Sequence, residues 1–255
     1  MSVQRRIEQA VRGGERAAVL TVIGGDVAAA GTRVGAKLFV LEGGGEVLGD
    51  GPRSLVALAD ALIRREKNHV IEHEGLNVFV EIVAPPPRIV VFGAVDTAES
   101  LCAMAKQLGW RTIVADARAK FATHERLPSA DEIIVAWPEE ALAQIKPDHQ
   151  TAIVVLTHDE KFDLPAIIGA LGTDCFYIGA LGSRKNQEKR RVRLLEAGIA
   201  EEQLSRICGP CGLDLGADSQ PETALSILAE AVAIRAGRDG GRLQGSKGRI
   251  HVGVE

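Results

Sequence analysis

Apolar and polar residues follow two different patterns along the chain, and the change of pattern divides it into two regions. In the first region, short β-rich runs predict strands over Ala17–Ile23, Ala36–Leu41 and Asn77–Val83. Ser54 is followed by apolar residues at helical spacing, which predicts a capped helix between the last two strands. The pattern therefore predicts a small α+β domain over residues 1–84.

A run of prolines separates this region from the next. Residues 85–87 are all proline, and because proline can continue neither a helix nor a central strand, they predict a stiff linker. Beyond the linker, continuous apolar runs of strand length predict strands that are buried on both faces. These runs are Ile89–Phe92, Thr112–Ala115, Ile133–Ala136, Ile153–Leu156 and Cys175–Ile178.

Amphipathic stretches fall between several of these strands and after the last one. They predict helices over residues 98–108, 164–171 and 187–197, and a final helix over Glu222–Arg235. Alternation of buried strands and amphipathic helices predicts an α/β fold, a Rossmann-like doubly wound parallel sheet over residues 88–236. Residues 237–255 are rich in glycine and basic residues without any period, which predicts a flexible tail.

Composition narrows the function classes. The 255 residues are 46% apolar and 25% charged with a net charge of −4, so we expect no wholesale disorder and no bulk attraction to nucleic acid or an anionic membrane. Aromatic residues make up only 4%, which disfavours a base-stacking single-strand binder. We expect no signal peptide and no spanning helix. Four cysteines fit a reduced, cytoplasmic location.

In an open parallel sheet, ligands bind beyond the carboxyl ends of the strands, so the residues there are candidates for a site. The first strand runs into Gly93, and a strand–glycine–helix turn offers free N–H groups to an anion. Only this glycine of the usual dinucleotide fingerprint is present. Asp96 either contacts a ligand or simply caps the next helix.

The second strand ends at Asp116, about 20 residues beyond the glycine turn, where a carboxylate binds ribose hydroxyls in dinucleotide-binding folds. A solvated loop aspartate is the alternative interpretation. Arg118 is close enough in sequence to serve a phosphate instead.

A cluster of polar residues, Thr157, His158 and Asp159, directly follows the fourth strand. His158 could act as acid, base or ligand, or serve only as a hydrogen-bonded anchor. Asp163 is predicted to cap the following helix, because Pro165 suits the first turn of a helix.

The fifth strand and the turn after it form the strongest phosphate-binding pattern of the chain. Glycines let the backbone approach a ligand, a serine can cap the next helix, and two basic residues sit at its positive end. A tyrosine of the strand is expected to line the same crevice. The alternative is a plain turn followed by a solvated basic helix. The residues concerned are Tyr177, Gly179, Gly182, Ser183, Arg184 and Lys185.

Cys208 and Cys211 form a Cys-x-x-Cys pair, which is typical of redox sites and of half a zinc site. The glycine-rich segment that follows is a poor helix start, and the other two cysteines fall in predicted core segments. Gly209 and Gly212 more simply predict a loop that passes close to a ligand. A redox or metal protein remains a separate hypothesis.

Five stretches of the second region occur together in an order that a known family shares. They are Asp116-x-Arg118 with residues 121–132, Thr157–Asp163, Phe176–Arg184, Gly209–Ala217 and Ala224–Glu230. Together they resemble the xanthine dehydrogenase accessory factor family (XdhC/CoxI), and the resemblance covers residues 88–236. Two departures are visible: the first turn has a single glycine, Gly93, and the first 84 residues contain no cysteine that could ligate a cofactor.

The resemblance implies a Rossmann-type domain that binds molybdenum cofactor, as molybdopterin or its dinucleotide form, and delivers it to a molybdenum hydroxylase such as xanthine dehydrogenase or carbon monoxide dehydrogenase. It implies an insertion factor rather than an enzyme, with the hydroxylase and a cysteine desulfurase as partners, and we expect a homodimer. From the residues alone, an NAD(P)-dependent oxidoreductase is the alternative, because Asp116 and the predicted sheet favour it.

Overall fold

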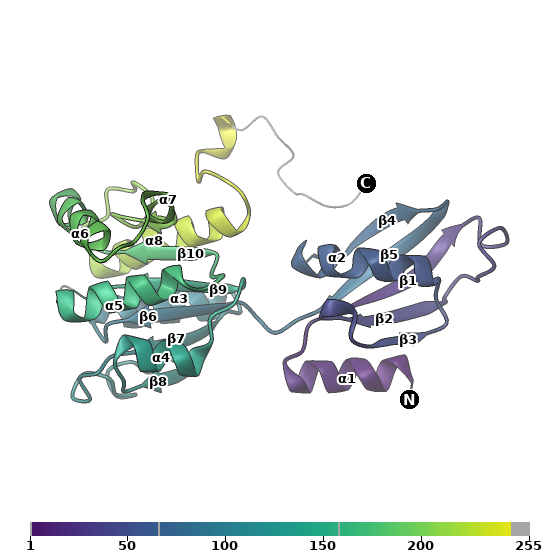
Figure 1. Cartoon of the computed structure of the whole chain (residues 1–255), viewed down its shortest axis with the longest axis horizontal. Helices are drawn as coiled ribbons and strands as arrows, with labels where there is room; N and C mark the ends of the chain where they lie inside the picture. The colour runs from purple at the N-terminus through teal and green to yellow at the C-terminus, as the bar shows by residue number, and fades with distance from the viewer. Residues whose placement is uncertain (1, 66, 158, 246–255) are drawn as a thin grey trace. The chain divides into compact units, whose positions relative to one another are not determined.

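The computed structural model describes residues 2–65, 67–157 and 159–245, which fold into two compact units (Figure 1). The first unit ends at Pro85 and the second begins at Pro86.

The first unit is an antiparallel sheet with the strand order β3-β2-β1-β5-β4. Its strands are β1 (Ala17–Gly25), β2 (Lys37–Leu41), β3 (Val47–Gly49), β4 (His69–His73) and β5 (Leu76–Val83). Its helical elements are α1 (Val3–Gly13), α2 (Ala59–Arg65) and the 3₁₀ turns η1 (Glu42–Gly44) and η2 (Arg53–Leu58).

Strand β1 is central, and its side chains alternate between two apolar layers. Ala18, Leu20 and Val22 belong to the layer that includes residues of α2, whereas Ala17 and Val19 belong to the layer that includes residues of α1. A helix therefore covers each face of the sheet. The predicted α+β character of this region is confirmed.

Helix α1 and strands β3 and β4 were not predicted. Helix α1 is mostly polar, and only Val3, Ile7 and Ala10, at helical spacing, pack on the sheet. The side chain of Arg6 is buried with them and is paired with two glutamates of the same unit. Ser54 caps no helix, because it lies inside η2, which begins after Pro52.

The second unit is a wholly parallel sheet with the strand order β11-β10-β9-β6-β7-β8. Its strands are β6 (Arg88–Phe92), β7 (Arg111–Ala115), β8 (Glu132–Ile134), β9 (Thr151–Val155), β10 (Tyr177–Ala180) and β11 (Ile207–Cys208). Its helices are α3 (Asp96–Gln107), α4 (Pro138–Ile145), α5 (Glu160–Leu171), α6 (Arg184–Glu196), α7 (Glu201–Leu204), α8 (Gln220–Arg235) and the 3₁₀ turn η3 (Leu243–Gly245).

Apolar layers fill both faces of this sheet, which explains the unbroken apolar runs of its strands. Ile89 and Val91 of β6 pack in the layer with α3 and α8, and Val90 and Phe92 pack in the layer with α4, α5 and α6. The strand order reverses between β6 and β9, which is the switch point where such sheets bind ligands. The predicted doubly wound Rossmann-like sheet is confirmed.

Three elements of this unit, α4, α7 and β11, are too short to show a clear period and were not predicted. The predicted tail begins at residue 237; its residues up to 245 include η3, and the rest lie outside the described residues. Among the described helices, none combines the length and the apolar character that crossing a bilayer demands.

Candidate functional site

A cavity of about 590 Å³ lies at the carboxyl edge of the parallel sheet, where β6, β7 and β9 end. We call it the crevice cavity. Its volume lies within the range of small-molecule sites. It is lined by Val95, Arg118, Leu156, Thr157, Asp159, Glu160, Lys161 and Phe162.

The turn after β6 approaches the crevice cavity closely because Gly93 has no side chain. Its φ of +115° suits glycine, and a Cβ there would lie 2.9 Å from Cγ2 of Thr157. Val95, not Asp96, is the N-cap residue of α3, so the predicted cap at Asp96 is wrong. Asp96 instead begins the helix and pairs with Arg126 at 3.3 Å.

Asp116 is turned inward and holds this turn. Its Oδ2 accepts the N–H of Ala94 at 2.9 Å, and its two oxygens accept bidentate hydrogen bonds from Arg118 at 2.9 and 2.8 Å. Burial alone would raise the pKa of Asp116, but the hydrogen bonds from Arg118 and Ala94 outweigh it and lower the pKa. Because both oxygens already have protein donors, Asp116 positions the site more directly than it offers a free carboxylate to a ribose.

Arg118 brings a fixed cation to the crevice cavity. The bidentate pair with Asp116 orients its guanidinium, which lies 4.8 Å from the ring centre of Phe121 and 5.9 Å from that of Phe162. Its side chain is still 43% exposed, so it can meet a phosphate.

A buried polar chain connects the crevice cavity with α6. The hydroxyl of Thr157 donates to Asp163, and Arg190 donates to the other oxygen of Asp163 at 2.8 Å and to the carbonyl of Leu181 at 3.2 Å. The side chains of Asp163 and Arg190 are 8% and 9% exposed. This pair was not predicted, because Arg190 occurs in a run of basic residues that is typical of a solvated helix.

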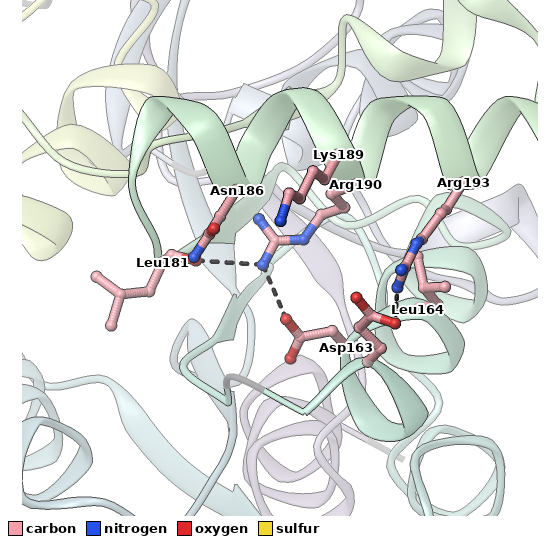
Figure 2. Close-up of a pocket in the computed structure, with 8 residues that line it drawn as sticks. Asp163, Leu164, Leu181, Asn186, Lys189, Arg190 and Arg193 are labelled. Carbon is pink, nitrogen blue, oxygen red and sulfur yellow. Dashed lines mark hydrogen bonds and ion pairs between the residues drawn. The ribbon is translucent and has the colours of Figure 1, made fainter.

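The same pair forms the wall of a second cavity of about 130 Å³ between α5 and α6 (Figure 2). Lys189, Arg190 and Arg193 face it from α6, and Glu160, which also lines the crevice cavity, pairs with Arg193. The N-cap residue of α5 is Asp159, whose side chain accepts the N–H of Lys161, so the predicted cap at Asp163 is wrong. His158 lies outside the described residues.

The turn after β10 behaves in part as predicted. Gly182 has a φ of +136°, and Ser183 caps α6 by accepting the N–H of Asn186 at 3.3 Å. Arg184 and Lys185 are exposed in the first turn of α6. Arg184 borders a third cavity of about 410 Å³ together with Gly209.

Tyr177 is an exception, because it does not line a crevice. Its side chain is fully buried, and its hydroxyl donates to Glu230 of α8 at 2.6 Å. Burial raises the pKa of Tyr177 well above its usual range. Gly179 leaves room for the Tyr177 ring, because a Cβ at this position would lie 2.6 Å from a ring carbon. Both residues therefore build the sheet rather than contact a ligand.

The loop after β11 is also held by Glu230, which ends one of the stretches that carry the family resemblance but was not predicted as a site residue. The N–H of Gly212 donates to Glu230 at 2.8 Å, and the φ of Gly212 is +106°. Burial, reinforced by Glu230, raises the pKa of Cys208 to about 11 and that of Cys211 to about 12. Thiols that stay protonated at neutral pH are poor nucleophiles and metal ligands. Within residues 2–65, 67–157 and 159–245, no three His, Cys, Asp or Glu side chains form a metal-binding group.

Cys208 and Cys211 should therefore react slowly with iodoacetamide in the folded protein. At pH 8 we expect rates about 200-fold lower for Cys208 and about 2,000-fold lower for Cys211 than for the thiols of the unfolded chain, whose pKa is about 8.5, and a tenfold rise per pH unit up to about pH 11. Because the pKa of each thiol is higher in the folded protein, the unfolded chain loses its thiol protons first. The free energy of unfolding should therefore fall as the pH rises from about 8.5 to about 11. Mass spectrometry of alkylated peptides measures both rates; rapid labelling at pH 7 would contradict the assignment.

Comparison with known proteins gives the fold and the family. A crystal structure from Bacillus halodurans, described as a xanthine dehydrogenase, superimposes with a TM-score of 0.68 at 24% identity, over 95% of this chain and 66% of that one, which shows a shared fold. A protein of Bacillus subtilis described as a probable xanthine dehydrogenase subunit is 33% identical over 62% of this chain and 46% of its own length.

A further relative is the molybdenum cofactor insertion chaperone PaoD of Escherichia coli, which is 29% identical over 63% of this chain and 44% of its own length. The match thus spans less than half the length of either of these curated relatives. Residues 89–231, more than half of the chain, match the family described as the XdhC Rossmann domain. The chain therefore belongs to the XdhC family, as its motifs and its parallel sheet together indicate.

Proposed function

We propose that this protein is a maturation chaperone that binds molybdenum cofactor, protects it and delivers it to a molybdenum hydroxylase such as xanthine dehydrogenase or carbon monoxide dehydrogenase. The observation that carries the proposal is the crevice cavity at the switch point of an XdhC Rossmann domain. The name of the Escherichia coli relative, a molybdenum cofactor insertion chaperone, supports the same role.

The residues of the crevice cavity suit such a cargo. Arg118 and Lys161 supply cations for a phosphate, the turn at Gly93 brings backbone close to the cavity wall, and Phe162 adds apolar surface to that wall. The described lining residues include no thiol that could ligate molybdenum, so the protein would hold the cofactor through its phosphate and its ring.

The remaining predicted contacts stay part of the proposal. Gly182, Ser183 and Arg184 belong to the turn after β10, and Gly209 to the turn after β11; of these residues, Arg184 and Gly209 line the third cavity. A nicotinamide-dependent oxidoreductase has less support, because Asp116 would have to bind ribose while both of its oxygens already accept protein hydrogen bonds. A cytoplasmic location, a homodimer and a cysteine desulfurase as second partner are further parts of the proposal.

The test is the pterin content of the full-length protein after purification from a host that makes molybdenum cofactor. We expect a fluorescent oxidised pterin after acid extraction, and about a tenfold weaker retention in Lys161→Met, because an exposed cation on the cavity is lost. Lys37→Met, an exposed lysine of β2 in the first unit, is the matched control. Absence of pterin together with no binding of added cofactor would refute the function.

A further inference from the structure

Three of the few aromatic residues of this chain gather beside the crevice cavity. The chain has six phenylalanines, two tryptophans and one tyrosine. Phe121 follows β7, Trp137 precedes α4, and Phe162 lies in the first turn of α5. Trp137 and Phe162 are stacked, with ring centres 4.5 Å apart and planes 10° apart. Three separate segments therefore bring aromatic rings to one edge of the sheet.

Two arginines extend this stack into a ladder of alternating rings and guanidinium groups. Arg118 lies against both Phe162 and Phe121, and Arg126 lies 5.1 Å from the ring centre of Phe121. Asp116 fixes Arg118 and Asp96 pairs with Arg126. The ladder is thus held in place by carboxylates, and stacked rings of this kind need little reordering when a further planar group is added.

The ladder ends at Trp137, which is 46% exposed although tryptophan is usually largely buried. The other tryptophan, Trp110, is only 4% exposed and packs edge-on against Phe176. Val135, two residues before Trp137, is 52% exposed. An indole that stacks one face on Phe162 and is 46% exposed offers stacking surface next to a cavity lined by two cations, Arg118 and Lys161.

We propose that the open face of Trp137 stacks the base of a nucleotide whose phosphate meets Lys161 and Arg118 in the crevice cavity. A nucleotide is favoured over a bare ring because flat aromatic surface and phosphate-binding cations occur together. The inference rests on the proposed function in one respect: the nucleotide would be the nucleotide half of the dinucleotide form of molybdenum cofactor. It makes Trp137 a specificity-determining residue for that form.

The test uses the full chain and simple probes: cytidine, guanosine and adenosine monophosphates, and ribose 5-phosphate, which lacks the base. We expect the monophosphates to quench tryptophan fluorescence. Trp137→Phe should abolish the quenching, whereas Trp110→Phe should leave it intact, because Trp110 is buried.

Calorimetric affinities separate the base from the phosphate. Trp137→Leu should weaken nucleotide binding about tenfold without changing the affinity for ribose 5-phosphate, and Lys161→Met should weaken both. Thermal unfolding shows that each variant is folded. Equal nucleotide affinity in wild type and Trp137→Leu, or no nucleotide binding at all, would overturn the inference.

The two proposals fail in different ways. A protein that binds nucleotides through Trp137 but carries no pterin and takes up no added cofactor would retain the stacking site and lose the chaperone function. A protein that carries pterin but binds no nucleotide would retain the function and lose the stacking site.

Discussion

Replacing Arg190 by methionine should lower the free energy of unfolding of the parallel-sheet unit by about 3–5 kcal/mol. The substitution leaves the carboxylate of Asp163 buried with no cation to balance it, and a buried charge that loses its partner is among the most costly single changes. The hydroxyl of Thr157 alone cannot neutralise this charge. Urea denaturation followed by tryptophan fluorescence measures the loss, since both tryptophans lie in this unit.

Arg191→Met provides the matched control, one residue along the same helix. Arg191 pairs with Glu201 at 2.5 Å, but the two side chains are 45% and 57% exposed, so we expect a loss below about 1 kcal/mol. The double variant Asp163→Leu/Arg190→Met should regain most of the stability, because it removes both charges. Equal losses of unfolding free energy in Arg190→Met and Arg191→Met would show that the buried ion pair contributes no more to stability than the exposed one.

Gly93→Ala should cost about 2–3 kcal/mol of stability and weaken ligand binding at least tenfold. An alanine must adopt a φ of +115°, and its Cβ would press on Thr157 at 2.9 Å from Cγ2 and 3.2 Å from the backbone nitrogen. Thr157 would have to move, and with it the wall of the crevice cavity. Urea denaturation measures the loss of stability, and calorimetric titration of the same samples with a nucleoside monophosphate measures the loss of affinity.

The control for this prediction is Gly109→Ala at the end of α3. Gly109 also has a positive φ, +74°, but a Cβ there meets nothing within 4 Å. Its substitution should therefore cost only about 1 kcal/mol for the left-handed backbone and leave ligand affinity unchanged. If both alanine variants lost the same stability and affinity, contact with Thr157 would not be the cause.

The parallel sheet was predictable because its strands are buried on both faces. Ile89–Phe92 and Ile153–Leu156 are unbroken apolar runs, and such runs separated by amphipathic helices admit few other folds. Helix α1 was not predictable in the same way, because only a narrow apolar stripe touches the sheet and the burial of Arg6 depends on two glutamates outside the helix, 9 and 40 residues away.

For the candidate site, the sequence predicted the sheet edge where the crevice cavity lies but not the orientation of each side chain. Sequence spacing placed Thr157, Asp159 and Arg118 at one edge of the sheet, and all three line the crevice cavity. Spacing could not show which way a side chain turns. Asp116 turns toward its own loop and Tyr177 toward α8, since each finds a hydrogen-bond partner that sequence distance hides. The same reason concealed the pairing of Asp163 with Arg190, 27 residues apart.

Glu230 makes the folding of the parallel-sheet unit during synthesis depend on α8. This one carboxylate on the last long helix receives both the phenol of Tyr177 and the amide of Gly212. Until α8 has emerged, Tyr177 and the loop after β11 lack their partner, although β6 to β10 have already been made. A nascent chain halted before α8 would therefore leave one apolar face of the parallel sheet partly uncovered, and binding competence would arise only after α8 has been made.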